Sequence, residues 1–393
     1  MDKLLGDHRR RAGLLALLLL AGCAGAGPGH TPGAGERNIP AGRTLARGGL
    51  LAPGSVVTVA EDPVNCRAPE AWRRAGSEYR LAASGPAWSG TPCPLVTTQL
   101  SPDGSVLAIY DFSGGRAELF ELGDAGFTPT GSASILSSAV FGFPPPGRNV
   151  ALATAGQRLL LGSINHGCRI AGGTRVCGSA ELFERQGGGW RTVATLLPPD
   201  DEDGVTRFGQ SVALTADGSL AVVGGTGEPG LGGGLWVYAL GQGAPRILQK
   251  LSAEAAETAF ANDLALSADG TWLAVGGEQA VHVFQRAGDG FTLRKTIRPP
   301  DSTAGYFGET VALSQDGRRL LVGAPRTDCD VGDRCGIAYL YERDRDWGLA
   351  RTIQPAVAAA DANFGHHIAI NRDGSEIAAQ GAAIHVFAAG GGP

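Results

Sequence analysis

The chain has 393 residues, of which 43% are hydrophobic, 18% are charged and 62 are glycine, and its formal net charge is −5. This charge argues against a nucleic-acid partner, because no basic stripe is available to replace the counterions of a phosphate backbone. The glycine content favours a turn-rich, all-β fold, since tight turns need residues that adopt positive φ.

Residues 1–22 have the features of a secretory signal peptide: a basic segment followed by an apolar run too short to span a bilayer stably. The run ends at Leu20–Cys23, whose Leu-Ala-Gly-Cys sequence resembles the lipobox of bacterial lipoproteins. The resemblance implies that Cys23 is acylated and anchors the protein to the cell envelope. Ala24 after it implies the outer membrane. An ordinary secretory signal with an incidental cysteine is the alternative.

Residues 23–50 are rich in glycine, alanine and proline and show no hydrophobic period. This composition predicts a flexible tether between the lipid anchor and the folded part of the protein. The remaining residues, 51–393, are expected to form one domain.

Six cysteines remain after Cys23, and an even set in an exported chain suggests disulfides. Local pairing is the simplest of the possible arrangements, and it gives Cys66–Cys93, Cys168–Cys177 and Cys329–Cys335. The last two pairs occupy the same place in two repeats, which supports this choice. No C-x-x-C motif occurs and no histidine lies at ligand spacing, so the sequence predicts no metal and no cofactor.

A short phrase recurs along the chain, and its clearest copy runs from Phe307-Gly308 to Asp316-Gly317. Before the turn the residues alternate between apolar and small or polar, and after it they form an apolar run, which indicates two strands, A and B, joined by an x-Asp-Gly hairpin. Six copies occur, with turn glycines at Gly104, Gly156, Gly218, Gly270, Gly317 and Gly374. The residues that we predict to be structural in the three best copies are Phe208, Gly209, Asp217, Gly218, Phe307, Gly308, Asp316, Gly317, Phe364, Gly365, Asp373 and Gly374.

A third strand, C, follows in each copy and is apolar on both faces, and a weaker strand D follows it. A sheet with two apolar faces is packed between two others, as the blades of a propeller are. We therefore predict an all-β propeller of four-stranded blades. Six blades are favoured by the number of copies, and a seventh, degenerate blade within residues 51–76 is the alternative. Because the last repeat lacks strand D, we expect Glu78–Ala83 to pair with it and close the ring.

The pattern Phe307-Gly308 … Gly323-Ala324-Pro325 resembles the FG-GAP repeat of integrin α-chains and of many exported bacterial proteins, over most of residues 97–388. The resemblance implies a propeller that binds partners through loops at one end of the ring, without conserved catalysis. Some integrin repeats bind calcium through several aspartates in the A–B turn. Each turn here holds at most one aspartate, so calcium is not expected.

Two acidic clusters lie in loops: Asp328, Asp330 and Asp333 within the loop closed by Cys329–Cys335, and Asp201 and Asp203 before the third repeat. A disulfide-closed loop is a candidate binding loop, because ordered loops on a rigid scaffold commonly carry recognition. His366-His367 could line the central channel, but no nucleophile motif accompanies it.

The resulting hypothesis is a non-catalytic, lipid-anchored binding module of the bacterial envelope, whose partner is an envelope protein or a polysaccharide. The alternative is a propeller hydrolase or lyase that acts on a sugar or lactone at the central channel. That class needs histidines and several carboxylates that converge from different blades.

Overall fold

The computed structural model describes residues 37–41, 43–50, 55–60, 68–76, 78–86, 96–111, 115–135, 149–164, 167–170, 173–199, 207–225, 234–241, 243–252, 260–277, 279–300 and 304–390. Cys23, Cys66, Cys93, Asp201 and Asp203 lie outside these ranges, as does the whole predicted signal peptide. No helix in the described ranges is long and apolar enough to cross a membrane.

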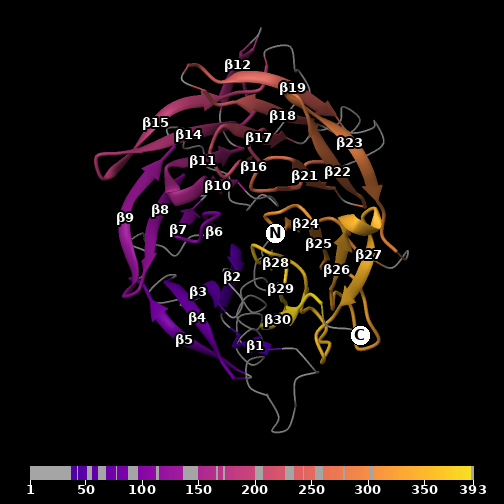
Figure 1. The fold of residues 1–393 in the computed structure, drawn as a ribbon. Coiled ribbons are helices and arrows are strands. Elements are labelled where there is room, and N and C mark those ends of the chain that lie inside the picture. The colour runs from indigo at the N-terminus through magenta and orange to yellow at the C-terminus, as the bar shows by residue number, and fades with distance from the viewer. Residues whose placement is uncertain are drawn as a thin grey trace, which may run out of the picture. The chain divides into compact units, whose positions relative to one another are not determined.

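The described strands form seven four-stranded antiparallel blades, numbered here 1 to 7 (Figure 1). Blade 1 consists of β2 (Arg43–Leu50), β3 (Ser55–Ala60), β4 (Pro69–Ala75) and β5 (Glu78–Ser84), and blade 2 of β6 (Val96–Leu100), β7 (Val106–Asp111), β8 (Arg116–Gly123) and β9 (Gly126–Ser134). Blade 3 consists of β10 (Val150–Leu152), β11 (Arg158–Ser163), β14 (Ser179–Gln186) and β15 (Gly189–Leu196). Blade 4 consists of β16 (Ser211–Leu214), β17 (Leu220–Gly225), β18 (Gly234–Ala239) and β19 (Arg246–Ser252).

Blade 5 consists of β20 (Asp263–Leu266), β21 (Trp272–Gly276), β22 (Val281–Ala287) and β23 (Gly290–Ile297). Blade 6 consists of β24 (Thr310–Leu313), β25 (Arg319–Ala324), β26 (Ile337–Glu342) and β27 (Gly348–Ile353). Blade 7 consists of β28 (His367–Ile370), β29 (Glu376–Gln380), β30 (Ile384–Ala388) and β1 (Arg37–Ile39). A small hairpin, β12 (Gly167–Ile170) and β13 (Gly173–Val176), projects from blade 3, and η1 (Thr154–Gly156) and η2 (Arg343–Arg345) are single 3-10 turns.

The innermost strands, β2, β6, β10, β16, β20, β24 and β28, contact one another in that order, and β28 also contacts β2. The blades therefore form a closed ring, which Figure 1 shows along its axis. The favoured count of six blades was wrong, and the alternative of seven is what the structure has.

Blade 1 is the blade that the repeat count missed. It contains neither the Phe-Gly nor the Asp-Gly dipeptide of the phrase, so no signature marks it in the sequence. Its innermost strand forms a single parallel bridge, Arg47 to Gln99, with the innermost strand of blade 2. The segment Ser55–Ala60 that suggested a degenerate blade is its second strand.

An N-terminal strand does close the ring, but it is not the predicted one. β1 pairs with β30 in the register Arg37 to Val386 and Ile39 to Ile384, and so becomes strand D of blade 7. Glu78–Ala83 instead lies in β5, the outer strand of blade 1. Residues 37–39 and 43–50, which we expected to belong to the tether, are thus part of the propeller.

Seven apolar clusters hold the ring together, one at each seam between neighbouring blades. At the seam of blades 6 and 7, for example, Leu321 and Leu340 pack with Ile368 and Ile377. Each blade therefore buries both of its faces, which explains why strand C is apolar on both sides.

Candidate functional site

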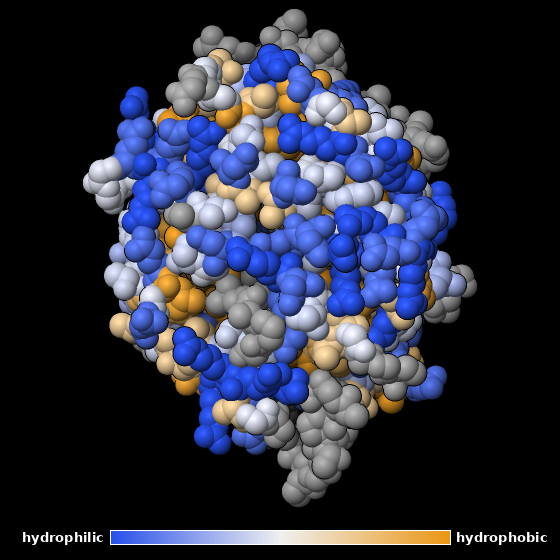
Figure 2. All heavy atoms as spheres, viewed as in Figure 1, coloured by the Kyte–Doolittle hydropathy of each residue, from blue (hydrophilic) through white to orange (hydrophobic). Residues whose placement is uncertain are grey.

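The direction of the strands divides the connections between two faces of the ring. Strand A of each blade runs away from one face, and the following strands alternate in direction. The D–A connections and the B–C loops therefore share one face, which we call the loop face. The A–B and C–D turns share the other, which we call the turn face. Figure 2 shows one face of the molecule, on which hydrophilic side chains predominate and apolar residues are scattered.

The Phe-Gly dipeptide joins neighbouring blades on the loop face. Phe208, Phe307 and Phe364 are completely buried in the seam clusters. Gly365 has a φ of 93°, and a Cβ added there would meet the Ile337 carbonyl oxygen at 2.8 Å. Gly365 packs against Gly323, which belongs to the Gly-Ala-Pro sequence of the preceding blade. A Cβ added to Gly323 would clash with the Gly365 backbone. The two halves of the phrase thus meet across the seam, as its predicted structural role requires.

The Asp-Gly turns are also structural. All six turn glycines have positive φ. In the turn of blade 4, Asp217 accepts hydrogen bonds from the Thr215 and Ser219 hydroxyl groups at 2.6 and 2.8 Å. Burial alone would raise the pKa of Asp217, but these bonds and that from the Ser219 backbone outweigh it and hold the pKa below its usual value. The described residues contain no cluster of histidine, cysteine, aspartate and glutamate able to hold a metal ion.

Asp316 and Asp373 make the same kind of contact in their own turns. The Ser314 hydroxyl group donates to Asp316 at 2.6 Å, and the Ser375 hydroxyl group donates to Asp373 at 2.7 Å. The single aspartate of each turn is therefore used to hold the hairpin.

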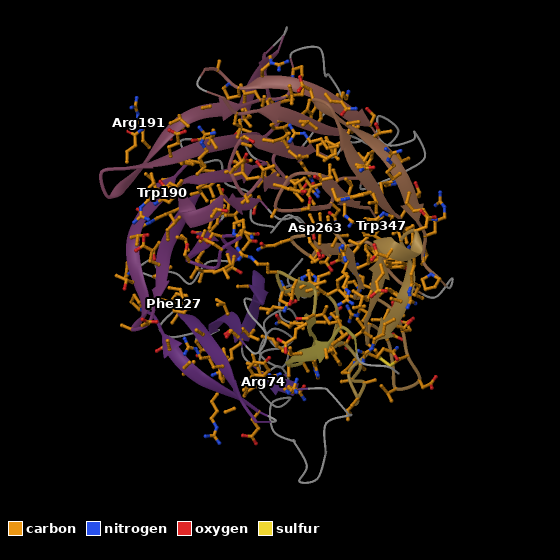
Figure 3. The ribbon with its side chains drawn as sticks, viewed as in Figure 1. Arg74, Phe127, Trp190, Arg191, Asp263 and Trp347 are labelled. Atoms are coloured by element: carbon orange, nitrogen blue, oxygen red, sulfur yellow. A yellow bond between two sulfur atoms is a disulfide. The ribbon has the colours of Figure 1, made fainter. Side chains whose placement is uncertain are left out.

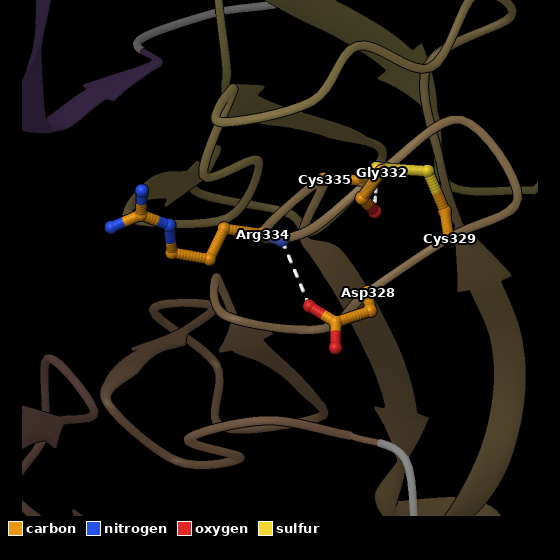
Figure 4. Close-up of a disulfide and its surroundings, with 5 residues drawn as sticks. All are labelled: Asp328, Cys329, Gly332, Arg334 and Cys335. Carbon is orange, nitrogen blue, oxygen red and sulfur yellow. Dashed lines mark hydrogen bonds between the residues drawn. A yellow bond between two sulfur atoms is a disulfide. The ribbon is translucent and has the colours of Figure 1, made fainter.

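The loop between β25 and β26 contains the predicted disulfide, Cys329–Cys335, with a Cα–Cα distance of 5.9 Å (Figure 4). Inside the loop, the Arg334 backbone N–H donates a hydrogen bond of 2.9 Å to the Asp328 carboxylate. Asp330 and Asp333 extend into solvent, and Val331 at the tip is 61% exposed. The loop is thus ordered by its own bonds while its acidic side chains remain accessible.

The same loop is also fixed to the next blade. The carbonyl groups of Asp333, Arg334 and Cys335 accept hydrogen bonds of 2.9, 2.9 and 3.0 Å from the backbone leading into blade 7. The last of these donors is Phe364 of the Phe-Gly dipeptide. An ion pair of 2.5 Å between Arg334 and Asp361 lies beside them.

The earlier cysteine loop, between β11 and β14, repeats this arrangement. Cys177 is disulfide-bonded, and its carbonyl group accepts a hydrogen bond of 2.9 Å from Phe208 of the next Phe-Gly. The side chain of Cys168 is outside the described part of the structure, so the pairing Cys168–Cys177 stays a prediction, as does Cys66–Cys93. Each cysteine loop is attached to a blade seam on the loop face.

Four polar side chains, Gln210, Asn262, Glu309 and His366, precede the innermost strands of blades 4 to 7 and form two pairs between neighbouring blades. Each is the third residue of its copy of the phrase. Gln210 donates to Asn262 at 2.9 Å, and His366 Nδ1 lies 3.0 Å from Glu309 Oε1. Figure 3 shows the next residue of one copy, Asp263, close to the ring axis, where its buried carboxylate accepts a hydrogen bond of 2.9 Å from Val311 N–H.

The sequence singled out His366 and His367 but assigned no role to Glu309. The Glu309 side chain is only 10% exposed, and its second oxygen lies 3.8 Å from Arg326. The signal that could have identified it is the third position of the phrase, which is polar in four consecutive copies. Among the described residues, Glu309 is the one carboxylate paired with His366.

Neither a protein-family model nor a curated protein matches this sequence. Several solved structures are similar. The Cps50 (Swd1) β-propeller domain of Myceliophteria thermophila has a TM-score of 0.60 at 13% identity, over 90% of this chain and 99% of that one. Hydrazine synthase of Kuenenia stuttgartiensis has a TM-score of 0.57 at 10% identity, over 93% and 99%. A protein of Bacteroides fragilis proposed to be a 6-phosphogluconolactonase has a TM-score of 0.51 at 16% identity, over 82% and 85%. At these identities the likeness establishes the β-propeller fold.

Proposed function

We propose that this chain is an exported, lipid-anchored propeller of the FG-GAP type that serves as a non-catalytic binding module at the bacterial cell envelope. Its partner is an envelope protein or a polysaccharide. The lipobox-like Leu20–Cys23 supports the anchor at the outer membrane, and the meeting of Phe-Gly with Gly-Ala-Pro at a blade seam supports the repeat type.

The observation that carries the proposal is the ordered cysteine loop of residues 329–335. A disulfide, an internal hydrogen bond and three bonds to blade 7 fix it, while Asp330, Val331 and Asp333 remain exposed at its tip. Such a loop loses little conformational entropy on binding, which favours affinity. The sister loop that ends at Cys177 is attached in the same way to another seam of the same face.

Affinity capture from intact cell envelopes tests the role of this loop. The test variant combines Asp330→Ala, Val331→Ser and Asp333→Ala, which leaves the disulfide and Asp328 in place. The control is Arg246→Ala, a mostly exposed residue on the outer strand β19. We expect the wild type and the control to recover one stoichiometric partner and the tip variant to recover at least tenfold less. Equal recovery by all three would refute the loop as the binding element.

Labelling of growing cells with radioactive palmitate tests the anchor separately. The wild-type chain should incorporate the label, and Cys23→Ala should not, because the acylated thiol is absent. Equal labelling of both chains would remove the lipid anchor from the proposal.

The pair His366–Glu309 favours the second candidate, a hydrolase or lyase of a sugar or lactone at the channel. A carboxylate that binds Nδ1 leaves Nε2 free to accept a proton, as in a general base. Assays of lactone and glycoside hydrolysis with wild type, His366→Ala and Glu309→Gln address this candidate. Turnover that both substitutions abolish would establish catalysis, and the absence of turnover would leave the binding module.

A further inference from the structure

A cavity of about 440 Å³ lies at the axis near the turn face, remote from the cysteine loops. Its size is within the range of about 300–1,000 Å³ typical of small-molecule sites. Six blades each contribute an aliphatic side chain from the same position of the repeat, three residues before the turn aspartate in most copies. These residues are Leu100, Leu152, Leu214, Leu266, Leu313 and Ile370.

A second ring lies next to it and consists of the residues one position earlier. Five of them are alanine, namely Ala151, Ala213, Ala265, Ala312 and Ala369, and in blade 2 the position is Gln99. The small alanine side chains leave room at the axis, so the body of the cavity is apolar.

The A–B turns form the rim, and direct backbone hydrogen bonds join them from blade to blade. Thr154 N–H donates to the Ala216 carbonyl at 2.7 Å, and Ala216 N–H donates to Ala268 at 3.0 Å. Ala268 N–H in turn donates to Gln315 at 3.0 Å, and Gln315 N–H to Arg372 at 3.2 Å. These hydrogen bonds fix the width of the opening before a ligand binds, so that less conformational entropy is lost on binding.

Two rim positions depart from the small residues found in the other turns. Gln315 and Arg372 occupy the place that alanine has in blades 4 and 5. Arg372 Nε donates a hydrogen bond of 2.8 Å to the Gln315 side chain, and both side chains reach the Pro102 carbonyl oxygen of blade 2. The guanidinium group is thereby held at the opening. It forms no ion pair with any described residue, and its Nη1 has no hydrogen-bond partner among them.

The charges around the opening decide which headgroup it would bind. Asp103 and Asp373 also line the cavity, and their carboxylates accept hydrogen bonds from Ser101, Ser105 and Ser375 in their own turns. These bonds leave both negative charges in place, so a direct pair with Arg372, and not the net charge of the rim, has to select the headgroup. Arg372, in contrast, keeps free N–H groups, and a guanidinium group pairs well with a carboxylate through two parallel hydrogen bonds.

We propose that the turn-face cavity binds an aliphatic carboxylate, with its chain against the aliphatic and alanine rings and its carboxylate on Arg372. This site is separate from the loop-face function, and one can fail while the other holds.

Calorimetric titration of the purified full-length chain tests the site with decanoate, decanol and decylamine, each below its micellar concentration. We expect one decanoate per chain, bound at least about tenfold more tightly than decanol or decylamine. Arg372→Ala should reduce decanoate affinity to that of decanol while leaving decanol binding unchanged, and Arg372→Lys should restore part of the difference.

Two controls separate the site from a general effect on the fold. Arg318→Ala removes an exposed cation from the same face that does not line the cavity, and it should bind decanoate as the wild type does. Ala268→Trp narrows the opening, and it should abolish binding of all three ligands. Failure of the wild type to bind decanoate, a preference for decylamine, or undiminished binding by Arg372→Ala would each overturn the proposal.

Discussion

Single residues in this propeller are constrained mainly by how closely one blade must approach the next. Three copies of the phrase place glycine at the seam with a φ of 86° to 93°. In blade 5 the same position is Ala261, which is held at a φ of 68° although it carries a side chain. The left-handed conformation costs an L-residue roughly 1–2 kcal/mol, so Ala261 is a strained residue at the seam of blades 4 and 5.

We therefore expect Ala261→Gly to stabilise the protein. Relief of the strain, roughly 1–2 kcal/mol, exceeds the loss of one buried methyl group, about 0.8 kcal/mol, so the net gain should be about 0.2–1.2 kcal/mol. The matched change Gly308→Ala should destabilise, because its Cβ would lie 2.8 Å from the Gly277 carbonyl oxygen at positive φ. Urea denaturation of both variants measures the difference, and changes of the same sign would contradict the argument.

The turn aspartates make stability dependent on acid. Hydrogen bonds within the turns outweigh burial and hold the pKa values of Asp217 and Asp269 below the usual value, and a bond from Ser375 does the same for Asp373. A lowered pKa stabilises the folded state above the unfolded-state pKa of about 3.9, and this stability is lost as pH falls through the lower folded value.

The double variant Asp217→Asn, Asp269→Asn should accordingly show a weaker loss of unfolding free energy between about pH 5 and pH 2 than the wild type. Urea midpoints measured across this range provide the comparison. The pair Asp330→Asn, Asp333→Asn is the control, because it removes the same charge from exposed carboxylates that lie outside the A–B turns. Identical slopes for the wild type and the first double variant would show that the turn bonds do not act through protonation.

At the scale of elements, the B–C loops combine two tasks. The loop of residues 329–335 presents acidic side chains to solvent, and it also holds the entry of the next blade through the Cys335 carbonyl group and Phe364. The same bond from Phe208 to Cys177 shows that the second cysteine of each loop is the point of attachment. Loss of a disulfide should therefore affect the seam as well as the loop.

We expect Cys329→Ser, Cys335→Ser to lower the unfolding free energy by about 2 kcal/mol, the value for closing a loop of this length in the unfolded chain. Hydrogen exchange should also become faster at the Phe364 amide group, which the loop carbonyl protects. The Phe208 amide group, bonded to the other cysteine loop, is the internal control and should keep its rate. Unchanged exchange at Phe364 would mean that the loop and the seam are independent.

At the scale of the whole molecule, closure depends on three residues that come from the opposite end of the chain. β1 supplies the outer strand of blade 7, and Ile39 is buried in the seam cluster of blades 7 and 1. This pairing covers the edge of β30 and ties the last blade to the N-terminal part of the chain, which couples the first and last blades.

Removal of residues 1–41 should thus destabilise the ring much more than removal of residues 1–35, which keeps β1. We expect the shorter chain to unfold at lower urea concentration and with a smaller m value, because blade 7 separates first and two-state behaviour is lost. Denaturation followed by both tryptophan fluorescence and circular dichroism measures this. Coincident transitions with equal midpoints for the two truncated chains would show that β1 is dispensable.

The sequence by itself determined the blade architecture and the structural role of the phrase. Alternating strands, Asp-Gly turns and a strand C apolar on both faces are local signals, and they require only neighbouring residues to be read. The disulfide Cys329–Cys335 was predictable for the same reason, since its partners are close in the chain and share a loop.

Only the tertiary structure decided the number of blades, the strand that closes the ring and the residues that meet at the axis. Blade 1 and β1 lack the phrase, and their strands are stabilised by pairing with residues remote in sequence, such as Arg37 with Val386. The pair His366–Glu309 and the group around Arg372 likewise join different blades. Contacts between blades depend on how the blades are arranged around the ring, which no local pattern in the chain specifies.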